Sequence, residues 1–331
     1  MKKYIAILLV AAMATLGISA CRKENSNKET KVQKDSDMKV VTTIFPEYDW
    51  VRQIAGEEAD QMDITMLLDN GVDLHSYQPT AEDIMKVSDC DLFVYVGGES
   101  DAWVDDALKQ AKNKDMQVVN LLDVLGNSVK EEEVIEGMEP EEEEEEGGEE
   151  EKPEYDEHVW LSVKNAEVLS KAIADALEKA DPDHKDVYQE NVSAYSEKLK
   201  NLDAKYQEVV DGASQKTLLF GDRFPFRYLV DDYGLSYYAA FVGCSAESEA
   251  SFETISFLAN KVDELGLKDI MAIENSNQKI AKTIIENTKE KNQKILTLDS
   301  MQSTISDDVK NGITYLSVME KNLEVLKEAL Q

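Results

Sequence analysis

Residues 181–212 read DPDHKDVYQENVSAYSEKLKNLDAKYQEVVDG, and this stretch decides the architecture of the chain. Its apolar residues recur in steps of three and four, which places them in one stripe along a single helix. These residues are Val187, Tyr188, Val192, Tyr195, Leu199, Leu202, Tyr206, Val209 and Val210. A helix of about 28 residues is about 42 Å long. Because one small domain does not need so long a helix, we predict that it joins two domains and ends at Gly212.

Strands and helices alternate on both sides of this helix. The predicted strands are residues 39–45, 63–68, 92–96, 117–121, 217–220, 237–241, 270–273 and 294–298. The predicted helices are residues 48–55, a helix capped by Thr80 and Asp83, and residues 103–112, 165–179, 226–232, 252–265, 278–290 and 312–330. Such alternation is typical of parallel sheets covered on both faces. The predicted fold class is therefore α/β, with two domains that each contain a four-stranded parallel sheet flanked by helices, joined by a long rigid helix.

The pattern also predicts the division of the chain into segments. The expected segments are a lipoprotein signal peptide (1–20), a flexible tether (21–38), an N-terminal α/β domain (39–164), helices that include the interdomain helix (165–213) and a C-terminal α/β domain (214–331). The N-terminal domain contains an acidic loop at 130–157 that is expected to be disordered.

The first residues have the order of an export signal. Lys2 and Lys3 precede a short apolar run, which Ile18-Ser19-Ala20-Cys21 closes. That run is too short to span a membrane, and the ending resembles a bacterial lipobox. We therefore predict cleavage before Cys21 and lipidation of Cys21, which would anchor the protein on the extracytoplasmic face of the cell membrane.

The charge of the chain is strongly negative. There are 68 acidic and 35 basic side chains, for a formal net charge of −33. Phosphate binding needs clustered lysine and arginine, so this balance argues against a nucleic-acid partner. Residues 131–157 alone contain 17 acidic residues and one lysine, and should attract cations.

Two of the three histidines, His75 and His158, stand on either side of this acidic run. Neutral imidazole is the commonest protein ligand of borderline metal ions. His75 follows a predicted strand, as do Asp222, Glu274 and Asp299. Ligands bind at the carboxyl ends of strands in open parallel sheets, although a polar residue there is more often a turn former.

Five motifs together resemble a known family. They are Ile44-Phe45-Pro46 with Tyr48-Asp49-Trp50-Val51, Gly71 to Tyr77, Asp91 to Gly98, Asp156 to Leu161, and Leu296 to Asp299. On these residues the chain resembles the solute-binding proteins of zinc and manganese ABC importers, over nearly all of its mature length. The resemblance implies two domains joined by a long rigid helix, and one divalent ion held between them at four ligand positions.

Three of the four ligand positions carry over, as His75, His158 and Asp299. The fourth falls on Gly221, which has no side chain. Glu247 is the candidate replacement, and Cys244 or a water molecule could also fill the gap. Two imidazoles favour zinc as the bound ion, with manganese next. Both imidazoles must be neutral to bind, so affinity is expected to fall below about pH 6.5.

The expected function is a metal-receptor lipoprotein that captures a divalent cation and delivers it to the permease of an ABC importer. The protein is expected to be a monomer. Enzymatic activity is not expected, since the chain has no His-Glu-x-x-His motif. Two alternatives remain open: the same fold could bind a metal chelate, or the protein could be a surface adhesin or metal-buffering lipoprotein.

Overall fold

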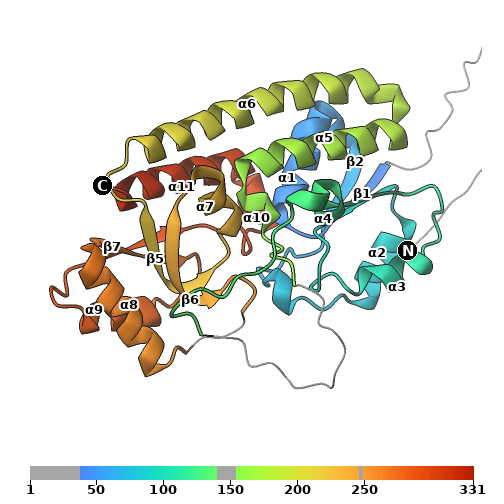
Figure 1. The fold of residues 1–331 in the computed structure, drawn as a ribbon. Coiled ribbons are helices and arrows are strands. Elements are labelled where there is room, and N and C mark those ends of the chain that lie inside the picture. Colours follow the sequence, from blue (N-terminus) through green and yellow to red (C-terminus); the bar gives the residue numbers. More distant parts are fainter. Residues whose placement is uncertain (1–37, 140–153, 246–248) are drawn as a thin grey trace, which may run out of the picture. The chain divides into compact units, whose positions relative to one another are not determined.

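Two four-stranded parallel sheets form the framework of the protein (Figure 1). The computed structural model describes residues 38–139, 154–245 and 249–331. The first sheet has the order β2-β1-β3-β4 and the second β6-β5-β7-β8. The strands are β1 (Met38–Thr42), β2 (Met62–Met66), β3 (Leu92–Tyr95), β4 (Gln117–Asn120), β5 (Thr217–Phe224), β6 (Ser236–Val242), β7 (Asp269–Ile273) and β8 (Lys294–Leu298). The predicted fold class is confirmed.

Helices flank both sheets. The α-helices are α1 (Phe45–Ala55), α2 (Ala81–Asp89), α3 (Val104–Lys109), α4 (Leu121–Leu125), α5 (Val163–Ala180), α6 (Lys185–Asp211), α7 (Arg227–Tyr233), α8 (Phe252–Leu265), α9 (Lys279–Asn287), α10 (Ser306–Lys310) and α11 (Tyr315–Ala329). Short 3-10 turns lie at η1 (Gly56–Gln61), η2 (Leu74–Ser76), η3 (Gly126–Ser128), η4 (Val159–Leu161) and η5 (Pro182–His184). The strand order reverses between β1 and β3 in the first sheet and between β5 and β7 in the second. Ligands of open parallel sheets bind at such points.

The long helix predicted from the apolar stripe is α6, with 27 residues. It packs against α1 and α5 near the first sheet and against α7 and α11 near the second (Figure 1). Its buried residues are Tyr188, Tyr195, Ser196, Leu199, Leu202, Tyr206 and Val210. The hydroxyl of Tyr206 donates a hydrogen bond of 2.6 Å to the carbonyl of Met319 on α11. The residues of the apolar stripe therefore pack α6 against helices next to both sheets.

Trp160 connects the segment after the first sheet to the segments after β8 within the main core. Its side chain is fully buried, and its indole Nε1 donates a 2.9 Å hydrogen bond to the carbonyl of Ser300, just after β8. The carbonyl of Trp160 accepts a 2.8 Å bond from the hydroxyl of Tyr315 at the start of α11. A second core lies between β6, α8 and α9, where Phe241, Leu258 and Ile284 are buried together.

Several predicted boundaries need correction. The strand predicted at 39–45 ends at Thr42, because Phe45 and Pro46 already form the first turn of α1, where proline is favoured. The strand predicted at 217–220 continues to Phe224 through a register shift, so Gly221 and Asp222 lie inside β5. The helix predicted after Thr80 is α2, and its capping box with Asp83 is confirmed.

The predicted acidic loop is only partly described. Residues 140–153 lie outside the described residues, but the two ends of the loop take defined positions. Glu131 pairs with Tyr155 in an antiparallel bridge, and Glu133 forms an ion pair with Arg227. Glu139 Oε2 accepts a 2.8 Å hydrogen bond from the Thr254 hydroxyl. Because bonds to cations and donors stabilise these carboxylates, the expectation of disorder does not hold for the ends of the loop.

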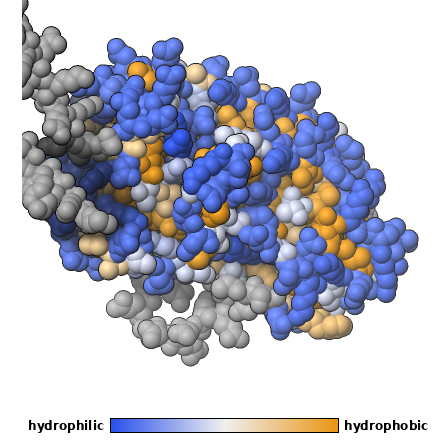
Figure 2. Space-filling view, turned by 180° about the vertical axis from the view of Figure 1, so that it is seen from behind, coloured by the Kyte–Doolittle hydropathy of each residue, from blue (hydrophilic) through white to orange (hydrophobic). Residues whose placement is uncertain are grey.

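Hydrophilic residues predominate on the face that Figure 2 shows, and hydrophobic residues occur there in scattered strips. Among the described helices, none combines the length and the apolar character that a membrane crossing requires. The predicted signal peptide, Cys21 and all of the predicted tether except Met38, the first residue of β1, lie outside the described residues.

Candidate metal site

His75 and His158 meet in the fold although 83 positions separate them in the chain. Their Nε2 atoms lie 3.1 Å apart, and their ring centroids 5.0 Å apart. Two nitrogens bound to one tetrahedral zinc ion at about 2.0–2.1 Å are about 3.3–3.4 Å apart. The observed pair is therefore close to the spacing that a shared metal ion requires.

A carboxylate fixes the ring of His158. Asp156 Oδ1 accepts hydrogen bonds from the backbone N–H of His158 at 2.8 Å and lies 3.0 Å from its Nδ1. A proton on Nδ1 donates to this carboxylate and leaves the lone pair of Nε2 free for a metal. His158 is fully buried, so water does not compete for that nitrogen.

His75 is oriented in a similar way from the other side. Its Nδ1 lies 2.9 Å from the hydroxyl of Ser100 and 3.5 Å from Glu157 Oε2. Asp73 Oδ1 accepts the backbone N–H of His75 at 3.0 Å. Both histidines thus follow an aspartate by two positions, and each aspartate holds the backbone of its histidine.

Cys244 is the third side chain at this place. The ligand atoms of His75, His158 and Cys244 all lie within 4.8 Å of one another, which makes them a group able to hold a metal ion among the described residues. Burial raises the pKa of the Cys244 thiol, and the negative charges of Glu132 and Asp156 raise it further. Cys244 and the buried Cys90 are both free cysteines.

The electrostatic surroundings of the site favour a cation. Glu157 is buried, and its Oε2 has no hydrogen-bond partner in the part of the chain that the structure describes. Burial raises the pKa of Glu157. Burial also acts to raise the pKa of Asp73, but a hydrogen bond and the charge of Arg223 outweigh it and leave that pKa below its ordinary value. A divalent ion would compensate the remaining buried negative charge.

The other predicted residues lie differently. Asp299 follows β8, and its Oδ1 accepts the backbone N–H of Met301 at 2.8 Å; it is not part of the group of three. Glu274 accepts bonds from the backbone and hydroxyl of Ser300 at 2.6 and 2.7 Å, so it organises the turn after β8. Asp222 Oδ1 accepts the backbone N–H of Arg223 at 3.0 Å. Glu247 lies outside the described residues.

The backbone at Gly221 is packed too tightly for any side chain that could bind a metal at this position. A Cβ built there would lie 2.5 Å from Cα of Ala281 on α9, closer than real contacts come. The nearby Arg223, which the sequence reasoning missed, forms an ion pair with Asp73 and so joins β5 to the segment that carries His75. No pattern in the sequence pointed to Arg223, whereas the shared Asp-x-His spacing could have identified Asp73 and Asp156.

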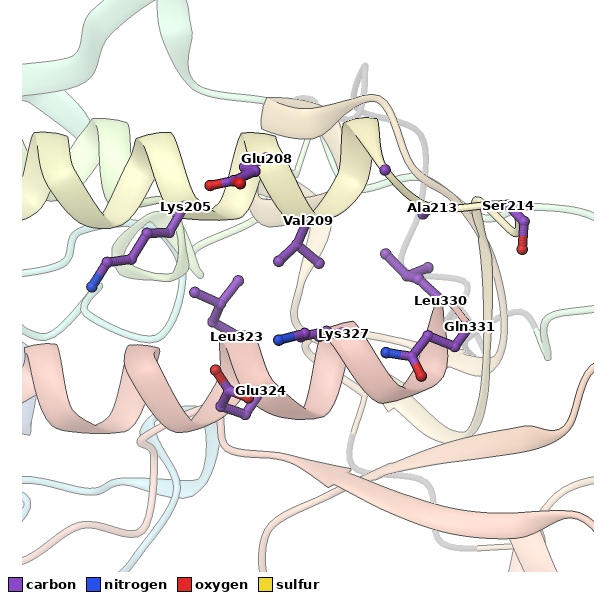
Figure 3. Close-up of a pocket in the computed structure, with 11 residues that line it drawn as sticks. Lys205, Glu208, Val209, Ala213, Ser214, Leu323, Glu324, Lys327, Leu330 and Gln331 are labelled. Carbon is purple, nitrogen blue, oxygen red and sulfur yellow. The ribbon is translucent and has the colours of Figure 1, made fainter.

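The His75 side of the site opens into a cavity of about 300 Å³. Asp73, Arg223 and Asn275 are among its lining residues, together with His75. A larger hollow of about 600 Å³ lies between the C-terminal parts of α6 and α11 (Figure 3). Its lining pairs the charged side chains of Lys205 and Lys327 with apolar ones and contains no histidine or cysteine. The cavity beside His75 is therefore the one next to metal-ligating groups.

Asp156→Asn is expected to weaken metal binding about 10–100-fold, because the amide no longer holds the Nδ1 proton of His158 as a carboxylate does. Asp181→Asn is the matched control, since Asp181 Oδ2 lies 2.6 Å from Nδ1 of His184, outside the site. Competition with a chromogenic chelator measures both affinities. Equal effects of the two variants would contradict a role of Asp156 in positioning His158.

The metal-free protein is expected to lose stability as the pH falls from about 6.5 towards 3. Burial, and next the charge of His158, lower the pKa of His75 to about 3. Unfolded histidine binds a proton below about pH 6.5, so within this window the unfolded state holds more protons and acid favours it. Urea unfolding at several pH values should show a shallower pH dependence for His75→Gln than for the unchanged chain. Parallel curves would refute this.

The same pKa changes the expectation for metal binding. Competition by protons at His75 should begin well below pH 6.5, the value expected from an unperturbed histidine.

Two parallel sheets are held together by one long helix, and a buried imidazole, a partly buried imidazole and a thiol form a group that can hold a metal. These features define a metal-binding α/β protein.

The family of the protein follows from comparison with known proteins. Residues 40–329 match the family model described as zinc-uptake complex component A, periplasmic, and the chain belongs to that family. It is 34% identical over 324 residues to the zinc-binding lipoprotein AdcA of Streptococcus pneumoniae, covering 97% of this chain and 60% of that protein. It is 32% identical to the high-affinity zinc uptake system protein ZnuA of Bacillus subtilis, covering 99% of this chain and 98% of that protein.

Solved structures agree with this assignment. The Zn(II)-bound ZnuA-like domain of Streptococcus pneumoniae AdcA superimposes with a TM-score of 0.68 at 30% sequence identity. The match covers 89% of this chain and 99% of that domain. Compared with the whole AdcA protein, the chain spans about 60% of the length. The resemblance stated from the sequence motifs is confirmed at the level of the family.

Proposed function

We propose that the protein is an extracytoplasmic receptor that captures one zinc ion and delivers it to the permease of an ABC importer. The observation that carries the proposal is the 3.1 Å approach of the Nε2 atoms of His75 and His158. Each ring has its Nδ1 occupied by a neighbour, so each offers the same nitrogen to the same point. Membership of a family of zinc-uptake components supports the transport role, as opposed to an enzymatic one.

Zinc is the proposed cargo because of the donor set. Imidazole ligands suit zinc, whereas magnesium and calcium prefer oxygen ligands. Manganese is the next candidate if the remaining ligands are oxygens, and Asp299 is the carboxylate that the family resemblance offers for this. The protein is proposed to act as a monomer, with the domain division at 39–164, 165–213 and 214–331 expected from the sequence.

Elemental analysis of the purified protein, followed by calorimetric titration with zinc, manganese, magnesium and calcium, tests the proposal. We expect one tight site per chain and the highest affinity for zinc. A protein that binds none of these ions tightly would contradict the receptor function. Tight binding only in the presence of a chelator would instead favour the alternative of a metal-chelate receptor.

The adhesin or metal-buffering alternative makes a different prediction for stoichiometry. Carboxylates in an acidic segment bind divalent ions weakly, and one chain then binds more than one ion. Salt screens the attraction between these charges beyond about 8 Å. A titration with several weak sites and no tight site would favour buffering by the acidic run over delivery of a single ion.

Cys21→Ser is expected to release the protein from membranes. We propose that the mature chain begins at a lipidated Cys21, which anchors it to the extracytoplasmic face. Acyl chains contribute about 0.8 kcal/mol per buried methylene, and more than one chain gives stable anchoring. Fractionation of cells that express the unchanged chain and the variant measures this. Retention of the variant in the membrane fraction would exclude anchoring through Cys21.

A further inference from the structure

The third side chain beside the two imidazoles is a thiol. The ligand atoms of His75, His158 and Cys244 all lie within 4.8 Å of one another. On tetrahedral zinc, with Zn–N of about 2.0–2.1 Å and Zn–S of about 2.3 Å, a nitrogen and a sulfur are about 3.6 Å apart. The sulfur therefore needs to approach the nitrogens by about 1.2 Å at most for the three atoms to share one ion.

We propose that Cys244 is the third protein ligand of the bound zinc ion, so that this chain holds its cargo through two imidazoles and a thiolate. The proposal rests on the proposed zinc-receptor function and specifies its ligand set. On binding, the thiol releases its proton to solvent and the sulfur forms a bond to the metal. Cys244 takes the place that the resemblance leaves empty at Gly221.

The chain places Cys244 through the residue before it. Gly243 follows the end of β6, and a Cβ built on it would lie 3.0 Å from Cε1 and 3.1 Å from Nδ1 of His158. The same Cβ would lie 2.9 Å from the carbonyl oxygen of Phe224. Only glycine lets the backbone pass this close to the ring, and the next residue then reaches the imidazole pair. On its other side the backbone N–H of Cys244 donates a 3.2 Å bond to Glu132 Oε1.

A second observation points to a cation at the same place. Glu157 is only 2% exposed, and its Oε2 lacks a hydrogen-bond partner among the described residues. This oxygen lies 3.5 Å from Nδ1 of His75, on the ring that would bind the ion. A buried carboxylate oxygen without a hydrogen bond is costly unless positive charge lies nearby. A metal ion on the other nitrogen of His75 would supply that charge through the ring.

The proposed ligand has a consequence for metal selection. Thiolate is a soft ligand that favours zinc and disfavours manganese and magnesium, which prefer oxygen. Cys244 would therefore be a specificity-determining residue. If Asp299 or Glu247 were the third ligand in its place, manganese would bind more competitively.

Cobalt substitution tests the sulfur ligand directly. The full chain loaded with Co(II) should show a near-ultraviolet charge-transfer band from thiolate to cobalt. Cys244→Ser should lose this band and bind zinc about 100-fold more weakly, with a much smaller change for manganese. Cys244→Asp should keep a metal site but lower the ratio of zinc to manganese affinity. Cys90→Ala is the matched control, since Cys90 is buried beside Met116, and it should retain the band.

The outcomes separate this inference from the proposed function. Tight zinc binding by the unchanged chain, with no sulfur band and an unaffected Cys244→Ser variant, would overturn the role of Cys244 and leave the receptor function standing. Failure of the unchanged chain to bind zinc at all would overturn the receptor function itself. Circular dichroism of the metal-free Cys244→Ser variant would show whether it folds, so that lost binding is not mistaken for lost structure.

Discussion

His158→Ala is expected to weaken zinc binding by about 100–1,000-fold. Apparent binding free energies of about 10–16 kcal/mol, shared among about four ligands, correspond to about 2.5–4 kcal/mol for each. His158 is fully buried, so its removal leaves a space that water reaches poorly. His75→Ala should have an effect of similar size, because its Nε2 faces the same point. Calorimetric zinc titration in the presence of a competing chelator measures both variants.

His184→Ala provides the control for these substitutions. The structure places His184 in contact with two carboxylates: Nδ1 is 2.6 Å from Asp181 and Nε2 is 3.4 Å from Glu58. It is thus an acid-paired histidine like the other two, but among the described residues it does not belong to the group of side chains able to hold a metal ion. Its removal should leave zinc affinity unchanged within about twofold. An equal loss in all three variants would leave the proposed receptor without its site.

Trp160→Ala is expected to destabilise the metal-free protein by about 3–5 kcal/mol, the usual cost of removing a buried aromatic side chain. Trp160 is fully buried, and the variant also loses the bond to the carbonyl of Ser300. Trp160→Phe keeps most of the volume and should cost less. Val168→Ala on α5 is the exposed control, at 47% exposure. Urea unfolding followed by circular dichroism measures the free energies.

The Trp160 substitution should also affect metal binding. The rings of Trp160 and His158 are 5.2 Å apart, so the space left by the indole allows the imidazole to shift. A variant that unfolds like Val168→Ala would show that the contact between the halves contributes little to stability. A variant that is destabilised but binds zinc normally would show that the Trp160 ring is not needed to position His158.

The elements that the sequence predicted best are those whose own residues determine them. The apolar stripe predicted α6, and the residue ranges of α8 and β8 were predicted as the structure has them. The end of β5 was not predictable in this way. Gly221-Asp222 is typical of a turn, yet Arg223 pairs with Phe241 and Phe224 with Val242 on β6, so pairing with the neighbouring strand extends β5. Local preference was outweighed there by a contact distant in the sequence.

The residues of the candidate site also differ in whether local sequence or a distant contact determines their position. His75 and His158 could be named as candidate ligands because their motifs and their acidic neighbours are local features of the sequence, and the structure brings their rings together. The position of Cys244 depends on how closely Gly243 packs against the ring of His158, which is a contact between distant segments. Sequence reasoning named Cys244 only as one option among several. Asp299 stays a prediction, since it follows β8 as expected but lies outside the group of three side chains.

The packing of Gly221 limits how the ligand set of this protein can be altered. A side chain at that position meets the backbone of Ala281, with the built Cβ 2.5 Å from Cα and 2.8 Å from the amide nitrogen. A histidine at position 221 would therefore have to displace the backbone of α9 at Ala281. Redesign of the metal preference, in the laboratory or by natural drift, has an easier route through the segment after β6 than through position 221, where the family resemblance locates a ligand.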